Sequence, residues 1–171
     1  MLVIKILKFG DMEIRVGFGY DIHRFIVNRK LILGGVEIPY IKGLMGYSDA
    51  DVVCHSIADA LLGAAALGDI GRHFPDTDMR FKNISSIVIL QHVGDLIRSN
   101  NYSIINVDST LVMQQPKISS YTMRMRENIS RALGTEINRV SVKATTNEEL
   151  DSIGSGGGAA SYAVATIRSV I

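Results

Sequence analysis

The sequence lacks several features that would assign it to a broad class of protein. Cys54 is the single cysteine, so no disulfide can form within the chain, and we expect a reducing, intracellular compartment. The formal net charge is +1, whereas proteins that bind nucleic acid usually carry a basic excess. Asp59 and Gly63 interrupt the longest apolar region, 58–67, which is far short of the about 18 apolar residues that a membrane helix needs. We therefore expect neither a nucleic-acid partner nor a membrane span.

The length and composition indicate one domain with a sizeable core. The chain has 171 residues, and we treat 1–171 as a single domain in which 1–11 form an N-terminal extension before Met12. These first residues resemble neither a secretory signal nor a transit peptide, which favours the cytoplasm, or an organelle stroma if they are the remnant of a targeting segment. Apolar residues make up 47% of the chain, so we expect some apolar surface to lie in contacts between subunits.

The apolar patterning predicts a mixture of strands and helices. Alternation over 13–22 is typical of a strand, and residues 43–47 and 69–82 are expected to be loops. Further strands are predicted at 30–33, 36–39, 103–113, 139–146 and 159–170, and helices at 48–67, 85–100 and from 119 or 120 to 134. Val140, Val142 and Ala144 are expected to face inward. The fold class is α/β (α+β): one mixed β-sheet with helices packed on one face.

Asp21, His23 and His55 are candidate metal ligands. Residues two apart in a strand point to the same face, so Asp21 and His23 project together, and His55 can meet them from the predicted helix that Ser48 caps. Two histidines and one carboxylate form a three-ligand zinc site with a fourth position open. Asp51, one helical turn before His55, is expected to orient its imidazole. The alternative is that both histidines are ordinary half-buried side chains.

Glycines lie on the same face of this strand as the candidate ligands. Gly17 and Gly19 share the face of Asp21 and His23, so bare backbone lies beside the proposed site. Glycine inside a strand often marks the close approach of a ligand or of another backbone. The sequence leaves both possibilities open.

Three polar segments are candidates for binding phosphate and sugar groups. The hydroxyls and N–H groups of 143–146 end a strand and can hold phosphate, and Glu148 adds an oxygen ligand for Mg²⁺ or Mn²⁺. Asp69, with Gly71, Asp76 and Asp78 after it, can accept hydrogen bonds from ribose hydroxyls, or these residues can simply form a loop. In the segment Gln114-Gln115-Pro116-Lys117, the lysine can contact phosphate as a point charge, or be merely solvated.

Taken together, these segments resemble a known enzyme family, the 2-C-methyl-D-erythritol 2,4-cyclodiphosphate synthases of the non-mevalonate isoprenoid pathway. The resemblance covers nearly everything after Met12, and its order and spacing are highly specific. The segments that carry it are Arg15–His23, Ser48–His55, Asp59–Gly71, Phe74–Asp78 and Lys143–Thr146 with Glu148.

The resemblance implies a metal-dependent enzyme that is a homotrimer with active sites between subunits. It implies that 4-diphosphocytidyl-2-C-methyl-D-erythritol 2-phosphate is cyclised by intramolecular phosphoryl transfer, with release of CMP. Asp21, His23 and His55 would bind Zn²⁺, and Glu148 would hold Mg²⁺ or Mn²⁺. Thr146, Glu148 and Tyr47 form the expected catalytic set. The expected substrate-binding residues are Ser48, Asp69, Gly71, Asp76, Asp78, Gln115, Pro116, Lys117, Ala144, Thr145 and Thr146.

The chain departs from the family pattern at a few positions. Tyr47 and Phe18 stand where histidine is common, and tyrosine carries no positive charge near neutral pH. Ser155 stands where the family commonly has an arginine linked to binding isoprenoid diphosphates at the trimer axis, and Gly157 where a glutamate is common, so we do not extend that regulatory site to this chain. Two other functions stay open: a zinc-dependent phosphohydrolase, and a non-catalytic, metal-stabilised nucleotide-binding module.

Overall fold

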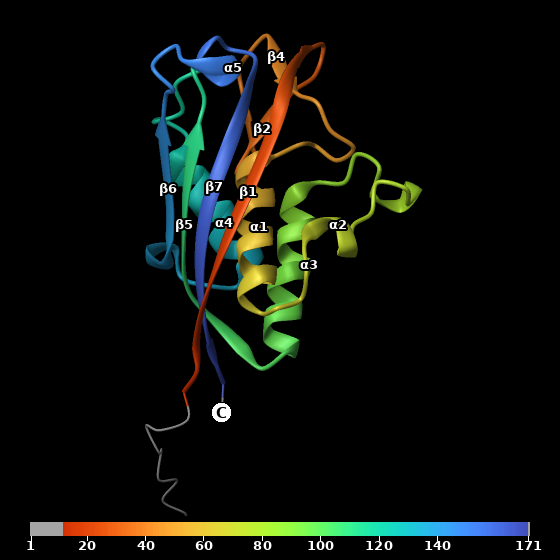
Figure 1. Ribbon diagram of the computed structural model, residues 1–171, viewed down its shortest axis with the longest axis vertical. Helices are drawn as coiled ribbons and strands as arrows, with labels where there is room; N and C mark the ends of the chain where they lie inside the picture. The colour runs from red at the N-terminus through yellow and green to blue at the C-terminus, as the bar shows by residue number, and fades with distance from the viewer. Residues whose placement is uncertain (1–11, 171) are drawn as a thin grey trace, which may run out of the picture.

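The structure is a computed structural model that describes residues 12–170, so the expected extension, 1–11, lies outside the described residues. Its centre is a five-stranded sheet with the order β4-β1-β7-β5-β6 (Figure 1). β5 and β6 are parallel, and the other neighbouring strands are antiparallel. The strands are β1 (Ile14–Val27), β4 (Lys42–Leu44), β5 (Tyr102–Val112), β6 (Val140–Thr145) and β7 (Gly158–Ser169).

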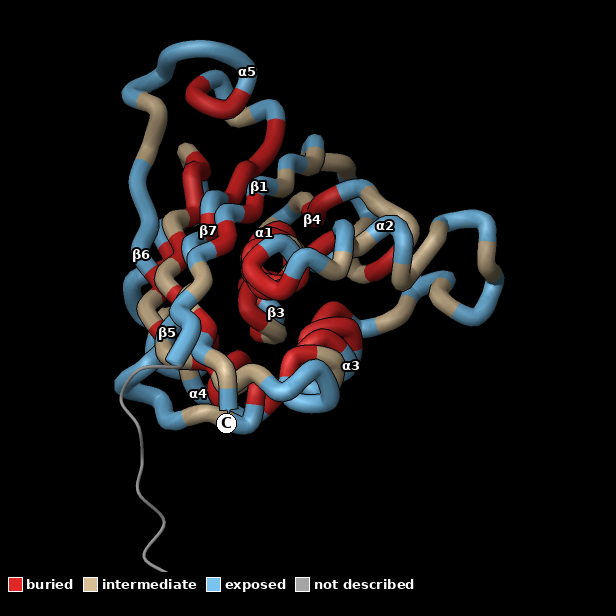
Figure 2. Tube along the Cα trace, turned by 60° about the horizontal axis from the view of Figure 1, so that its bottom comes forward, coloured by how far each residue is buried: buried red, intermediate tan, exposed pale blue. Residues whose placement is uncertain are grey.

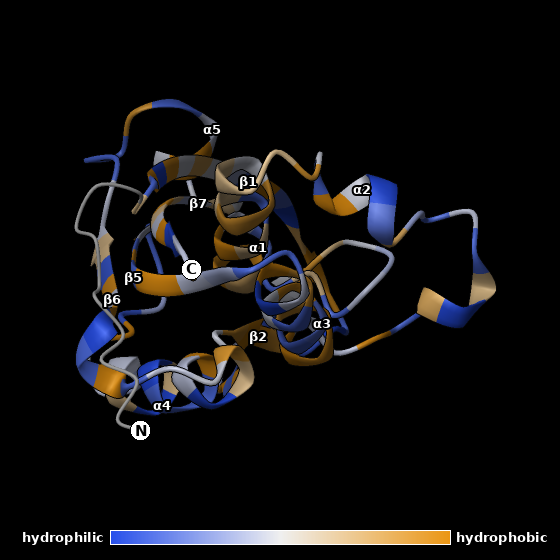
Figure 3. Cartoon of the chain, turned by 90° about the horizontal axis from the view of Figure 1, so that it is seen from below, coloured by the Kyte–Doolittle hydropathy of each residue, from blue (hydrophilic) through white to orange (hydrophobic). Residues whose placement is uncertain are grey.

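The main helices lie on one face of this sheet. They are α1 (Val52–Ala64), α3 (Ser86–Ser99) and α4 (Thr122–Leu133) (Figures 1 and 3). The expected fold class, one mixed sheet with helices packed on one face, is therefore confirmed. Within 12–170, no helix is both long and apolar enough to cross a bilayer.

Several short elements complete the chain. β2 (Leu31–Leu33) and β3 (Val36–Ile38) are the two short strands that were predicted here, and they pair with each other. β4 occupies part of the region expected to be loop. The expected loop 69–82 contains α2 (Ile70–His73) and the 3-10 turn η1 (Met79–Phe81). Two further turns were not predicted, η2 (Ile137–Arg139) and α5 (Asp151–Gly154). Such elements are too short to show a periodic pattern.

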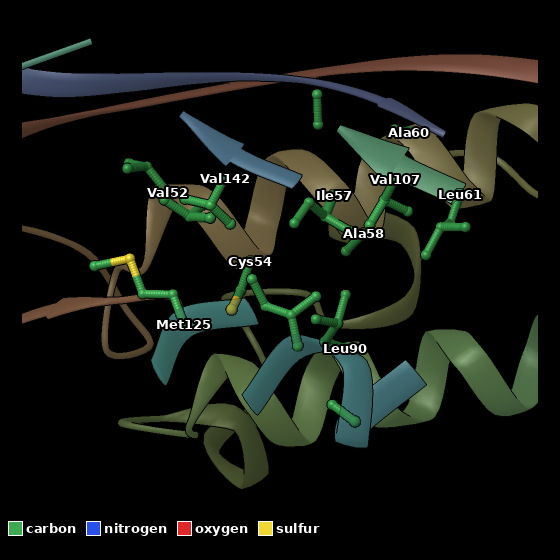
Figure 4. Packing of buried hydrophobic residues seen from close by; sticks show 14 of the residues in the cluster. Val52, Cys54, Ile57, Ala58, Ala60, Leu61, Leu90, Val107, Met125 and Val142 are labelled. Atoms are coloured by element: carbon green, nitrogen blue, oxygen red, sulfur yellow. The ribbon is translucent and has the colours of Figure 1, made fainter. Parts of the chain in front are cut away.

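The core lies between the sheet and the helices, and α1 is at its centre. Most residues of α1 are buried, which Figures 2 and 4 show as a buried helix enclosed by the sheet and by α3 and α4. Cys54 is 1% exposed and packs in this core. Val140 and Val142 also face inward, but Ala144 is exposed, contrary to expectation, because the end of β6 borders a cavity.

Two glycines allow α1 to pack directly on the backbone of β1. A Cβ atom at Gly17 would lie 1.9 Å from the carbonyl oxygen of Ala60, and one at Gly19 would lie 1.9 Å from that of Ser56. Real side chains do not approach backbone atoms so closely. The bare backbone beside the candidate ligands is therefore occupied by another backbone.

The opposite face of the sheet carries exposed apolar side chains. Val16, Phe18 and Tyr20 on β1 are 66%, 63% and 41% exposed. The rings of Tyr20 and Tyr162 lie 4.9 Å apart between centroids, so the neighbouring strands form a continuous apolar surface. Monomeric proteins rarely expose such a surface without a use for it.

Asp51, and not Ser48, is the N-cap of α1, so the predicted helix start is wrong by several residues. The carboxylate of Asp51 accepts hydrogen bonds from the N–H groups of Val53 and Cys54 at 3.1 and 3.2 Å. It also accepts from Gly34 and Gly35 in the β2–β3 turn, at 2.9 and 2.7 Å. It makes no hydrogen bond with His55, so the prediction that Asp51 orients that imidazole is wrong. One carboxylate instead joins a hairpin turn to the start of the central helix.

Replacing Asp51 tests this junction. We expect Asp51→Ala to lower the free energy of unfolding by about 2–4 kcal/mol, because it removes a helix cap and leaves buried N–H groups without an acceptor. Urea unfolding followed by circular dichroism measures the change. Asp95→Ala, which removes an exposed carboxylate from its pair with Arg98, is the control and should cost much less. Equal losses in the two variants would contradict this role of Asp51.

Candidate active site

Asp21, His23 and His55 converge at the junction of β1 and α1. Each offers one ligand atom, and these atoms all lie within 4.8 Å of one another. Oδ2 of Asp21 is 2.9 Å from Nδ1 of His55 and 3.3 Å from Nε2 of His23. β1 supplies the first two side chains on one face, and the first turn of α1 supplies the third. The structure therefore brings the three predicted ligands together.

The charges of this cluster depend on one another. Burial alone would raise the pKa of Asp21, but hydrogen bonds with His23 and His55 outweigh it, and the pKa lies well below its usual range. For His55, burial acts to lower the pKa, but the hydrogen bond and charge of Asp21 outweigh it and raise the pKa above its ordinary value. A carboxylate that stays ionised among half-buried imidazoles favours a positive charge at this point.

The donor set fits a divalent cation. Two imidazoles and one carboxylate are ligands that Zn²⁺ uses in catalytic sites, where the fourth position stays open. The side chains are only partly buried, with 23%, 23% and 12% exposed for Asp21, His23 and His55. An open approach therefore remains beside the three ligand atoms.

That approach is a cavity of about 280 Å³ between β1, α1 and the segment that follows α1. Tyr47, Ser48 and Asp76 line it together with the three candidate ligands, so six of the predicted site residues meet here. Apolar side chains form the rest of the wall: Ile70, Phe74, Phe81, Ile84 and Ile89. The cavity combines a metal-binding corner with an apolar wall.

Tyr47 is tied to the edge of this cavity. Its hydroxyl donates to the backbone oxygen of Asp78 at 3.2 Å and lies 3.5 Å from Sδ of Met79. The carboxylate of Asp78 binds Arg80 and caps η1, so it does not line the cavity. Tyr47 thus joins the cavity to η1.

Asp69 and Gly71 lie beside the cavity but do not line it. Asp69 is exposed and caps α2, where its Oδ1 accepts from the N–H of Arg72 at 2.9 Å. Asp59 of α1 accepts from the N–H of Ile70 at 2.8 Å, which fixes the start of α2 against α1. The two predicted ribose contacts are therefore held near the metal corner by α1.

The other predicted residues gather around a second cavity of about 380 Å³ at the ends of β5 and β6. Its lining includes Pro116, Lys117, Ala144, Thr145 and Thr146. Gln115 is exposed and is not part of the lining. Glu148 adjoins the cavity, since its Oε1 accepts from the hydroxyl of Thr146 at 2.7 Å.

The two cavities share no lining residue. β7 and β5 lie between β1 and β6, and three steps of about 4.8 Å separate those strands by about 14 Å. One copy of the chain therefore holds the predicted residues in two separate groups.

The similarity to known proteins covers almost the whole described chain. The sequence pattern of the YgbB family matches residues 14–168. The chain belongs to this family. A relative named 2-C-methyl-D-erythritol 2,4-cyclodiphosphate synthase, from Prosthecochloris aestuarii, is 58% identical over 154 residues, which are 90% of this chain and 98% of that protein.

Solved structures of YgbB-like proteins have the same fold. The bifunctional IspDF from Campylobacter jejuni matches with a TM-score of 0.89 and 42% identity over 92% of this chain, which spans 43% of that longer chain. The Plasmodium falciparum IspF in complex with CDP matches with a TM-score of 0.81 and 36% identity over 92% of this chain and 97% of that one. The family resemblance inferred from the sequence is confirmed.

Sequence reasoning missed several residues at the two cavities of this YgbB-family chain. The hydroxyl of Ser86 contacts both His55 and Asp49, and Ser119 and Thr122 line the second cavity. Gln114, which belongs to the predicted segment 114–117, lines that cavity as well. Ser86 is 31 residues from His55 along the chain, so no spacing rule relates them. Asp49 lies two residues before Asp51, the residue that was predicted to orient His55. The contact of Asp49 with Ser86 depends on where α1 begins.

Gly19 sets the distance between β1 and the turn of α1 that carries His55. We expect Gly19→Ala to push α1 away from the sheet, lower the free energy of unfolding by about 1–3 kcal/mol and weaken Zn²⁺ binding. Competition with a chromogenic chelator measures the affinity. Gly63→Ala is the matched control, because its Cβ would meet only the oxygen of Phe18, at 4.0 Å. Unchanged Zn²⁺ affinity in Gly19→Ala would contradict this account.

Proposed function

We propose that this chain uses the Asp21–His23–His55 centre to cyclise 4-diphosphocytidyl-2-C-methyl-D-erythritol 2-phosphate, with release of CMP. The cyclisation is the activity of the family to which the chain belongs and places it in the non-mevalonate isoprenoid pathway. The observation that carries the assignment of the site is the convergence of three ligand atoms beside a cavity. Two structures of the enzyme from other sources are CDP complexes, which supports a cytidine diphosphate ligand here.

The reaction needs positioning more than acid–base chemistry. The 2-phosphate oxygen attacks the β-phosphorus, a new P–O bond forms, and the bond to the CMP oxygen breaks. The attacking group belongs to the same molecule, so orientation supplies much of the rate enhancement. Bound at Asp21, His23 and His55, Zn²⁺ would supply positive charge that lowers the repulsion between the phosphates. Ser48 and Tyr47 lie at the cavity wall. The hydroxyl of Ser48 can orient phosphate oxygens, and that of Tyr47 can do so if it exchanges its hydrogen bond with the backbone oxygen of Asp78 for one with the substrate.

We assign the nucleotide end of the substrate to the second cavity. Lys117 would contact phosphate, Thr145 and Thr146 would donate hydrogen bonds, and Glu148 would hold Mg²⁺ or Mn²⁺ beside the diphosphate. Glu148 fits an oxygen-ligand cation, since its carboxylate is exposed and its hydrogen bond comes from the hydroxyl of Thr146. Asp69 and Gly71, which lie beside the metal cavity, would meet the ribose from a neighbouring copy of the chain.

We further propose a homotrimer in which the metal cavity of one copy faces the second cavity of another. The separation of the two cavities within one copy and the exposed apolar face of β1 and β7 support this arrangement. Burying that face between copies would stabilise the assembly and complete the site in one step. A cytoplasmic location is part of the proposal and is supported by the single, buried cysteine.

Replacing His55 tests the metal centre. We expect His55→Ala to lose one zinc ligand and to reduce formation of the cyclic product by at least about a hundredfold. Phosphorus NMR of purified protein with the cytidine substrate, with and without chelator, measures both CMP and the cyclic diphosphate. His92→Ala, which removes an exposed histidine of α3, is the control and should keep full activity.

Each outcome of this assay separates the candidate functions. CMP release without a cyclic product would favour the phosphohydrolase, and tight substrate binding without CMP would favour the binding module. Full turnover by zinc-free His55→Ala would refute the proposal.

Replacing Glu148 tests the second cation. We expect Glu148→Gln to raise the Mg²⁺ or Mn²⁺ concentration needed for half-maximal activity by about tenfold or more, with zinc content unchanged, because one anionic oxygen ligand is lost. A metal titration of the initial rate measures this. Glu149→Gln changes the adjacent exposed glutamate and should leave the titration as in the wild type. An identical shift in both variants would contradict a ligand role for Glu148.

A further inference from the structure

Nε2 of His55 faces two serine hydroxyls. Nδ1 faces Asp21, and Nε2 lies 2.8 Å from Oγ of Ser86 and 3.2 Å from Oγ of Ser48. Ser86 is the first residue of α3 and is fully buried. The closer of the two hydroxyls therefore reaches His55 from a different helix and is shielded from water.

The hydroxyl of Ser86 also contacts a carboxylate. It donates to Oδ1 of Asp49 in a very close contact, while Oδ2 of Asp49 accepts the backbone N–H of Ser86 at 2.9 Å. An ionised carboxylate can only accept hydrogen bonds, so the single hydroxyl proton of Ser86 points to Asp49. The oxygen of Ser86 then has only lone pairs to offer to His55.

This arrangement of protons decides which nitrogen of His55 is free. Since Oγ of Ser86 can only accept, Nε2 of His55 must carry the proton of that hydrogen bond. A neutral imidazole protonated on Nε2 has its lone pair on Nδ1. Nδ1 is the atom that faces Asp21 and the candidate metal centre. Without a cation, Nδ1 donates a proton to the Asp21 carboxylate, and a bound cation would displace that proton while the proton on Nε2 stays.

We propose that Asp49 and Ser86 are positioning residues that hold the His55 proton on Nε2 and so keep Nδ1 available to a divalent cation. The inference rests on the metal centre proposed above and adds how this chain prepares one of its ligands. Asp49 is linked to the imidazole through the hydroxyl of Ser86. Partners of this kind fix the orientation and tautomer of metal-binding histidines.

Zn²⁺ affinity of Ser86→Ala is the first test. We expect it to fall by about 10–100-fold, measured by competition with a chromogenic chelator and without substrate. Ser56→Ala is the matched control. Ser56 is also fully buried and adjoins His55 in the sequence, but its hydroxyl binds the oxygen of Val53 and Oγ of Ser161. Equal Zn²⁺ affinities of the two variants would overturn the inference.

Asp49→Asn is a second test that keeps the size of the side chain. The amide oxygen would accept the N–H of Ser86, and the amide NH₂ would donate to its Oγ. The hydroxyl proton of Ser86 would then turn to Nε2 of His55 and leave the imidazole proton on Nδ1. We expect weaker Zn²⁺ binding than in the wild type, although the number of hydrogen bonds is conserved; wild-type affinity in this variant would overturn the inference even if Ser86→Ala failed to fold.

Nitrogen NMR of the zinc-loaded wild type gives a readout that a purely structural role would not move. We expect a proton on Nε2 of His55 that exchanges slowly with water, and faster exchange of that proton in Ser86→Ala than in Ser56→Ala. A proton on Nδ1 would overturn the inference. If the wild type bound no Zn²⁺, the metal centre would fail as well, whereas zinc binding that Ser86→Ala leaves unchanged would remove this inference alone.

Discussion

The close contact between α1 and the glycine backbone of β1 determines where the metal ligands stand. Carbonyl oxygens of Ser56 and Ala60 lie where side chains at Gly19 and Gly17 would be. The helix can therefore approach β1 closely enough for Nδ1 of His55 to reach within 2.9 Å of Oδ2 of Asp21. A strand with ordinary side chains on this face would hold the helix farther away and separate the ligands. The missing side chains at Gly17 and Gly19 thus help to set the geometry of the site.

The long periodic elements and the three metal ligands could be predicted from the sequence because local rules decide them. Alternation along β1 places Asp21 and His23 on one face, and the helix that follows supplies His55. The start of α1 could not be predicted in the same way. Both Ser48 and Asp51 are good helix caps, and the choice depends on the Gly34–Gly35 turn, whose N–H groups also need the carboxylate of Asp51. The contact of Asp51 with this distant turn therefore determines where α1 begins.

The pairing of Asp49 with Ser86 has the same origin. Asp49 precedes α1, and Ser86 begins α3, so the two meet only after the helices have packed. The N–H of Ser86 is one of the donors that the start of α3 leaves free, and Asp49 accepts it. The carboxylate of Asp49 thus accepts an N–H group at the start of α3. Through the hydroxyl of Ser86 it is also linked to His55 on α1. Packing of α3 and preparation of His55 are coupled for that reason.

The trimer that we propose would explain both the apolar face of the sheet and the division of the site into two cavities. Strands β1 and β7 place apolar side chains outward, although the helices already bury the other face. The helices cover one face of the sheet. Burial of the other face against a second copy would add hydrophobic stabilisation. The metal centre lies on β1, whereas the second cavity lies two and three strands away on β5 and β6. In the trimer that we propose, association through the exposed face would bring β1 of one copy toward β6 of the next, so the contact that buries the apolar surface would also bring the two halves of the site together.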